Sequence, residues 1–73
     1  MRLPVLKPKE VLSALQRAGF FVHHVSGSHY ILKHPTKNLR VTLPFHTKDL
    51  KRRTLQSIID QAGMTDEEFS DLI

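Results

Sequence analysis

The hydrophobic positions in the first part of the chain follow the period of an α-helix. After Pro8, which suits a first helical turn, apolar side chains recur three or four positions apart from Val11 to Ala18. Gly19 stands where a glycine commonly ends a helix. The pattern therefore predicts a first helix that opens at Lys7 and ends before Gly19.

Beyond this glycine the pattern shortens to the period of β-strands. Bulky and β-branched residues fill 20–25, a second apolar run spans 30–32, and an alternating run follows at 39–43. Breaks at 26–27 and 34–38 separate these runs. Three strands joined by short turns predict an antiparallel sheet with one face toward the helices.

The alternation within the strands assigns side chains to the two faces of this sheet. The third strand turns its apolar residues to the core and Arg40 to the open face. In the second strand Tyr30 and Leu32 make the better core pair, which leaves His29 and Lys33 on the open face. We therefore expect His29, Lys33 and Arg40 to share one surface, although a β-bulge near the turn would invert this assignment.

The clearest helical stripe of the chain consists of Leu55, Ile58, Ile59 and Ala62. Thr47 can cap this second helix, which we expect to begin near Lys48 and to end at Gly63. Thr65-Asp66-Glu67-Glu68 is typical of a capping box. It predicts a short final helix with an apolar face at Phe69, Leu72 and Ile73. The expected fold is α+β, with one helix, three antiparallel strands and two further helices.

Length and composition predict a single domain, residues 1–73, with one small core, since 40% of the residues are hydrophobic. The chain has no cysteine, so it can form neither a disulfide framework nor a thiolate zinc site. No apolar run approaches the about 18 residues of a membrane span, and no signal-type stretch follows Met1. We expect a cytoplasmic protein without a membrane partner.

Charge is unevenly distributed along the chain. All eleven Lys and Arg lie at or before Arg53, and only Glu10 and Asp49 oppose them there, which leaves +9. Residues 54–73 carry five acids and no base, so the whole chain has a net charge of +4. A basic body with an acidic end suits a nucleic-acid-binding surface, while the acids themselves fit a solvated helix face.

The motif Gly27-Ser28-His29 falls in the predicted tight turn between the first two strands. It puts an imidazole at the start of a strand, where the sheet can hold the side chain in a fixed orientation. Because histidine takes and gives protons near neutrality, His29 on a small basic domain points to chemistry on a phosphodiester. The alternative is a hairpin histidine that only helps the chain to turn.

Several further residues are candidates for binding RNA phosphates. They are Gly27, Ser28, Lys33, Arg40, His46, Lys48, Lys51, Arg52 and Arg53. Ser28 is as suited to a hydrogen bond within the turn as to a phosphate. His46 fits a solvated or capping role as well as a functional one, and the run Lys51–Arg53 is typical of a solvated helix face.

Two histidines and two phenylalanines of the first strand could also have functional roles, in metal binding and in base stacking. We expect His23 and His24 to point to opposite faces of the strand, with no carboxylate spaced to complete a site, so no metal is predicted. We also expect no small-molecule cofactor. Phe20 and Phe21 could stack on RNA bases, although core packing is the ordinary role for at least one of these rings.

The order and spacing of five short motifs resemble the HicA family, small bacterial and archaeal mRNA interferase toxins. The motifs are Gly19-Phe20, Gly27-Ser28-His29, His34-Pro35, Val41-Thr42-Leu43-Pro44-Phe45-His46, and Leu55…Ile58…Gln61-Ala62-Gly63. The resemblance covers about residues 5–72. It implies a fold similar to the double-stranded RNA-binding domain, ribosome-independent cleavage of mRNA, and neutralisation by a HicB antitoxin.

The resemblance also implies that His29 is the catalytic residue, because the active histidine of the family lies in its Gly-Ser-His motif. Two positions depart from the family pattern. His24 stands where an arginine is frequent, which bears on phosphate contact, and Arg53 stands where a glycine is frequent.

Together these features predict a metal-independent endoribonuclease in which His29 serves as a general base or acid and lysines and arginines hold phosphate. The leaving-group acid is unassigned, with His46 or water as candidates. One alternative is a non-catalytic double-stranded RNA-binding module, which needs the same basic face. Another is a module that binds only protein.

Overall fold

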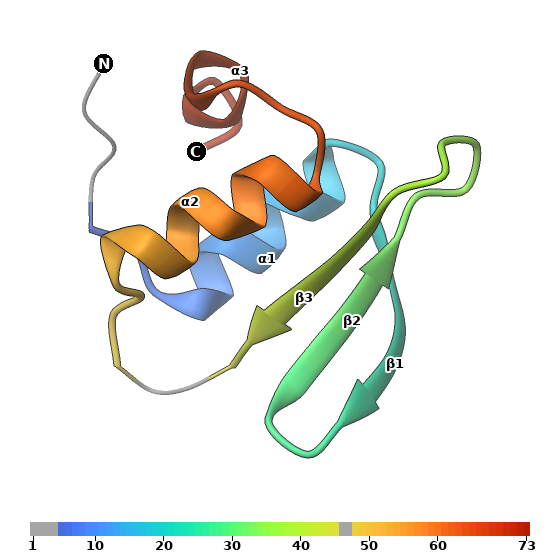
Figure 1. Ribbon diagram of the computed structural model, residues 1–73, viewed down its shortest axis with the longest axis horizontal. Coiled ribbons are helices and arrows are strands. Elements are labelled where there is room, and N and C mark those ends of the chain that lie inside the picture. The colour runs from blue at the N-terminus through green and yellow to red at the C-terminus, as the bar shows by residue number, and fades with distance from the viewer. Residues whose placement is uncertain (1–4, 46–47) are drawn as a thin grey trace.

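One helix precedes three antiparallel strands and two helices follow them in the computed structural model, which describes residues 5–45 and 48–73 (Figure 1). The elements are α1 (Pro8–Arg17), β1 (Phe21–Ser26), β2 (His29–Lys33), β3 (Arg40–Pro44), α2 (Arg52–Gln61) and α3 (Asp66–Ser70). This confirms the α+β order predicted from the sequence. It is consistent with the fold of a double-stranded RNA-binding domain.

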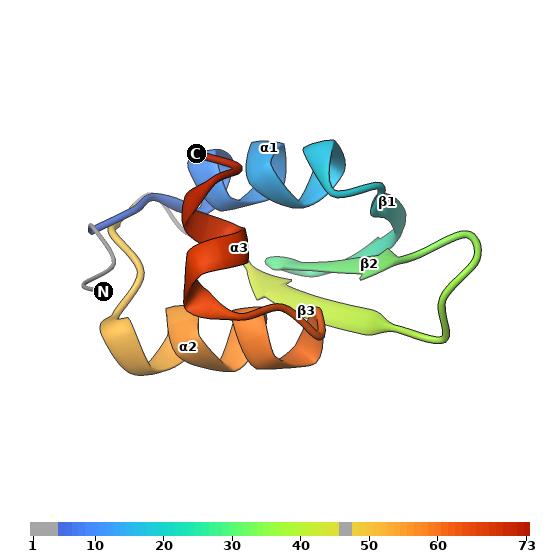
Figure 2. The same cartoon turned by 90° about the horizontal axis from the view of Figure 1, so that it is seen from above.

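The sheet has the strand order β1-β2-β3, and α1, α2 and α3 all lie on one side of it (Figure 1). Seen from above in Figure 2, α1 and α2 run along the sheet with α3 between them. None of these three helices covers the other face of the sheet, which we call the open face. The strand β1 reaches beyond the helices, so Val25 is 51% exposed although it lies on the core side of the sheet.

The core lies between the helices and the sheet and draws on every element, although β1 contributes only the partly buried Val22. Its fully buried larger side chains are Val11, Leu15, Leu32, Val41, Leu43, Ile58, Ile59 and Phe69. Tyr30 packs against this cluster from the same side as Leu32. The predicted assignment of strand faces is therefore confirmed, since the register leaves His29, Lys33 and Arg40 on the open face.

The helix ends follow the predicted signals in α1 and α3. α1 begins at Pro8, and Gly19 follows its end. In α3, the Thr65 hydroxyl accepts the backbone N–H of Glu68 at 3.1 Å, and the Glu68 carboxylate accepts that of Thr65 at 2.8 Å. This capping box is the predicted one. α3 ends at Ser70, however, and Ile73 is 44% exposed rather than part of an apolar helix face.

The predicted start of α2 is wrong. The helix begins at Arg52 with Lys51 as the residue before it, so Lys48 precedes the helix, and Thr47 lies outside the described residues. Leu50 explains the difference, because its side chain is buried in the core and its backbone N–H donates to the carbonyl of Leu6 at 2.8 Å. Lys51, the next residue, is still extended, and the helix begins only after it.

The described helices contain no segment that is long and apolar enough to cross a membrane.

Candidate functional site

The turn that carries the Gly-Ser-His motif is a two-residue hairpin between β1 and β2. Ser26 pairs with His29, and Gly27 and Ser28 form the loop. Gly27 has a φ of +59° while the φ of Ser28 is not positive, which is the pattern of a type II′ turn. The backbone N–H of Phe45 donates to the Ser28 carbonyl at 2.7 Å, so the turn is tied to the end of β3.

The strand register arranges the open face in three rows across the sheet. The first row is Ser26, His29 and Pro44, the second is His24, Ile31 and Thr42, and the third is Phe21, Lys33 and Arg40. The exposed His29 therefore lies at one end of the face and the two cations lie at the other. His29 and Lys33 are four residues apart in β2, which corresponds to about 13 Å.

A β-bulge in β1 adds a second histidine to the middle row. The register shifts between Val22, which pairs with Leu32, and His24, which pairs with Ile31, so that His23 is the extra residue of the bulge. Their Nδ1 atoms lie 2.9 Å apart, and the ring centroids are 5.1 Å apart. The prediction that the two histidines point to opposite faces is thus wrong. Ile31 is only 6% exposed although it lies outside the core cluster, which fits the crowding opposite it.

The electrostatic environment of this face is cationic. The three strands contain no aspartate or glutamate, so no carboxylate of the sheet itself offsets Lys33 and Arg40. The positive charge of Lys33, partial desolvation, the neighbouring His24 and the charge of Arg40 together lower the pKa of His23 below its ordinary value of 6.5. A face of this kind attracts anions and disfavours further positive charge.

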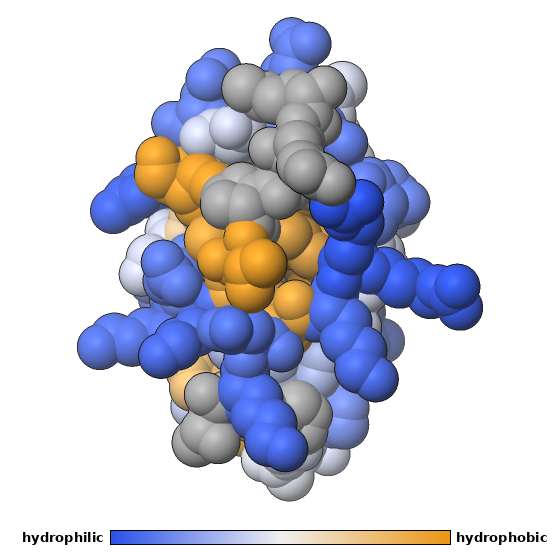
Figure 3. Space-filling model, turned by 90° about the vertical axis from the view of Figure 1, so that its left-hand side faces the viewer, coloured by the Kyte–Doolittle hydropathy of each residue, from blue (hydrophilic) through white to orange (hydrophobic). Residues whose placement is uncertain are grey.

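The remaining cationic candidates lie beside the His29 row rather than on the sheet. Lys48 and Lys51 line a shallow hollow of about 370 Å³ together with Pro44, which pairs with His29. Figure 3 shows the side of the molecule where α2 begins, with hydrophilic side chains around an apolar patch. Arg52 and Arg53 are exposed in the first turn of α2, on the helical side of the molecule (Figure 1). His46 lies outside the described residues.

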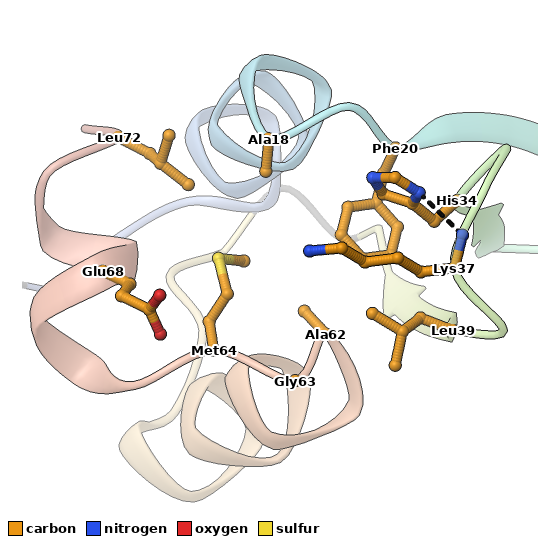
Figure 4. A pocket seen from close by; sticks show the side chains of 10 residues that line it. All are labelled: Ala18, Phe20, His34, Lys37, Leu39, Ala62, Gly63, Met64, Glu68 and Leu72. Atoms are coloured by element: carbon orange, nitrogen blue, oxygen red, sulfur yellow. Dashed lines mark hydrogen bonds between the residues drawn. The ribbon is translucent and has the colours of Figure 1, made fainter.

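A second hollow, of about 240 Å³, opens between the β2–β3 connection and the C-terminal ends of α1 and α2 (Figure 4). His34 lines it, and its Nδ1 accepts the backbone N–H groups of Thr36 and Lys37 at 3.2 and 3.1 Å. Its Nε2 lies 3.0 Å from where a Cβ on Gly19 would stand. His34 therefore shapes the connection between β2 and β3, and Gly19 leaves it room.

Sequence reasoning missed one feature of the open face and left a second one open. The His23–His24 pair depends on a bulge for which the sequence carries no glycine or turn signal. Phe21 is 43% exposed in the row of Lys33 and Arg40, whereas Phe20 is buried. Of the two rings considered for base stacking, only Phe21 is thus accessible. In residues 5–45 and 48–73, no three His, Asp or Glu side chains lie where they could hold a metal ion.

Comparison with known proteins decides the family. The model of the HicA toxin of bacterial toxin–antitoxin systems matches residues 8–64, which include α1, the whole sheet and α2. The chain belongs to the HicA toxin family. A search of curated proteins found no match. As a HicA toxin, the protein is one half of a toxin–antitoxin pair, and its family implies an antitoxin partner.

Proposed function

We propose that this HicA toxin is a metal-independent endoribonuclease that cleaves mRNA in the cytoplasm and is neutralised by a HicB-like antitoxin. The observation that carries the proposal is the position of His29. Its imidazole is exposed at the start of β2, on the same cationic face as Lys33 and Arg40. The family match over residues 8–64 supports a toxic activity of this kind.

The chemistry needs a base for the ribose 2′-hydroxyl and positive charge near the phosphorus. A neutral His29 takes the proton of the 2′-hydroxyl, whose oxygen then attacks the neighbouring phosphorus. The bond from phosphorus to the 5′-oxygen breaks, and the 5′-oxygen takes up a proton and leaves as a hydroxyl. The product strand ends in a 2′,3′-cyclic phosphate. Gly27 and Ser28 support this role because their tight turn, tied to Phe45, keeps His29 at a fixed place beside the substrate.

The RNA phosphates on either side of the cleaved bond would contact two sets of cationic side chains. Lys33 and Arg40 bind the backbone along the open face. Lys48 and Lys51 bind it across β3, where their hollow borders the His29 row. The exposed Arg52 and Arg53 extend this second group along α2, and His46 belongs to the same proposed RNA-binding set.

The antitoxin is expected to be acidic where it covers this face. A partner that presents carboxylates to Lys33 and Arg40 would compensate a charge that the strands themselves leave uncompensated. Covering the open face would also keep RNA away from His29.

Incubating the purified protein with a defined RNA, with and without EDTA, tests the proposal. We expect cleavage in both conditions, 2′,3′-cyclic phosphate ends, and loss of cleavage in His29→Ala but not in Gln16→Ala, an exposed position of α1. Fragments with a 3′-hydroxyl would contradict the mechanism, and cleavage only without EDTA would contradict metal independence.

The α-β-β-β-α order also supports a second candidate, a non-catalytic double-stranded RNA-binding module. Expression of His29→Ala separates the two. The endoribonuclease predicts that growth arrest disappears with this variant, whereas sequestration of RNA by binding predicts that it persists.

A further inference from the structure

The two histidines of the bulge form a hydrogen-bonded pair whose chemistry follows from its geometry. With the Nδ1 atoms 2.9 Å apart, one ring donates its Nδ1–H and the other accepts with its lone pair. The pair can then carry one extra proton, because the protonated ring still donates to its neutral neighbour. A second proton would set two N–H groups against each other, close to Lys33 and Arg40.

The pair stands across the sheet from His29 at a distance that suits a phosphodiester. Ser26 faces His29 directly, so His24, two residues before it in β1, is the diagonal neighbour of His29 on the open face. Diagonal neighbours of an antiparallel pair lie about 7–8 Å apart, with their Cβ atoms somewhat closer. Long side chains at this separation can reach opposite sides of one phosphate group.

We propose that His24 is the acid that protonates the leaving 5′-oxygen and that His23 positions it. This rests on the proposed endoribonuclease activity. His29 removes the proton of the 2′-hydroxyl, and the 2′-oxygen bonds to phosphorus. The bond from phosphorus to the 5′-oxygen breaks as the Nε2 proton of the His24 imidazolium passes to that oxygen. The cleavage leaves a 2′,3′-cyclic phosphate, a 5′-hydroxyl, protonated His29 and neutral His24, and solvent then returns both histidines to their starting states.

His23 has a separate task in this scheme. By accepting the Nδ1–H of His24, it fixes the orientation of that ring in both of its states. Before the step His24 is an imidazolium whose Nε2 carries the transferable proton, and after the step it is a neutral ring that keeps its proton on Nδ1. Lys33, desolvation, His24 and Arg40 lower the pKa of His23, which favours the neutral form that can accept. Among the described residues, the charged and titratable groups that face the pair are Lys33, Arg40 and His29, all of them from the sheet, and none is a carboxylate. In the proposed scheme it is therefore the anionic phosphodiester of the bound RNA that offsets the positive charge of the His24 imidazolium.

The decisive experiment compares normal RNA with RNA in which sulfur replaces the 5′-oxygen at the cleaved bond. Sulfur leaves without a proton, so it makes an acid unnecessary. We expect His24→Gln to slow cleavage of normal RNA by about 10²–10⁴-fold. On the sulfur-containing RNA the same variant should cleave almost as fast as the unmodified protein, whereas His29→Ala should fail on both substrates. Val25→Ala, next to His24 but on the other side of the strand, is the matched control.

The pH dependence of the rate tests the task of His23. A bell-shaped profile is expected, with a fall at high pH as His24 loses its proton. In His23→Ala the fall in rate should move to lower pH, because the His24 imidazolium no longer has a hydrogen-bond acceptor at Nδ1. In His23→Gln the side-chain carbonyl can accept this hydrogen bond, so the fall should return to its original pH. In His24→Gln the fall should disappear.

Three results would overturn this inference and would still be compatible with the proposed endoribonuclease activity. They are normal cleavage by His24→Gln, a defect of this variant that persists with the sulfur leaving group, and an unchanged pH profile in His23→Ala. The second result would assign the pair to phosphate binding. An unmodified protein that cleaves neither RNA would instead overturn the proposed function.

Discussion

Gln61, the last residue of α2, accepts the backbone N–H of Thr42 in the middle of the edge strand β3 at 3.0 Å. The same side chain donates to the hydroxyl of Ser57 at 3.1 Å, so the helix holds it in place. An edge strand otherwise presents such N–H groups unpaired. This one hydrogen bond therefore both closes part of the β3 edge and fixes α2 against the sheet.

We expect Gln61→Ala to lower the free energy of unfolding by about 1–2 kcal/mol, because it leaves the part-buried Thr42 N–H without its acceptor. Urea unfolding followed by circular dichroism measures this change. Gln16→Ala, at an exposed position of α1, should stay within about 0.5 kcal/mol of the unmodified protein. Equal midpoints for the two variants would show that the hydrogen bond contributes little.

The turn before His29 gives a second prediction. Gly27 has a φ of +59°, and a Cβ placed there would meet nothing within 4 Å, so Gly27→Ala adds backbone strain without a clash. We expect the free energy of unfolding to fall by about 1–2 kcal/mol. Gly27→Asn should be less destabilising, because asparagine adopts positive φ more readily. Thermal unfolding of both variants tests this order, and a reversed order would contradict it.

The capping box of α3 predicts a pH-dependent contribution to stability. Hydrogen bonds from the backbone and side chain of Thr65 lower the pKa of Glu68 from its ordinary value of 4.5. The folded state thus favours the ionised carboxylate, and this contribution is present above pH 4.5 and is lost as the pH falls through the lowered pKa. Glu68→Gln should be less stable than the unmodified protein at about pH 7 in urea unfolding. A difference that stays the same in strong acid would contradict this assignment.

Local sequence signals predicted an element correctly where no contact with a distant part of the chain competes with them. The α3 capping box, the end of α1 before Gly19 and the strand faces all depend on residues close in sequence, and each is confirmed. The predicted start of α2 was wrong because a distant contact, between Leu50 and Leu6, competes with the local signal at Lys48. Tertiary contacts of this kind are not visible in a local pattern.

The candidate site likewise has features that the sequence could predict and features that it could not. The position of His29 could be predicted, since the turn and the alternation both specify it. The pairing of His23 with His24 could not, because strict alternation separates neighbours on a strand and the bulge that joins them has no local signature. Whether cations such as Arg52 lie near the sheet likewise depended on where α2 begins.

The charges around the bulge predict a change in the titration of His23. Lys33 is the largest cause of its lowered pKa, followed by desolvation, His24 and Arg40. We expect Lys33→Gln to raise the pKa of His23 toward 6.5. Lys9→Gln, on the exposed side of α1, should leave it unchanged. Titration of the imidazole signals by NMR measures both values, and an unmoved midpoint in Lys33→Gln would contradict the arrangement of these charges.

The two cations of the third row also predict the salt dependence of RNA binding. In a His29→Ala background, which binds RNA without cleaving it under the proposed mechanism, affinity should fall as salt rises because bound counterions are released. Replacing both Lys33 and Arg40 by glutamine should make the slope of log affinity against log salt shallower, by about 0.7 for each phosphate that the protein then leaves unneutralised. Lys9→Gln serves as the control, since Lys9 lies on α1 and not on the open face. If the double variant keeps both the affinity and the slope of its parent, RNA does not follow the open face. The same replacements at Lys48 and Lys51 would then show whether it follows the hollow beside β3.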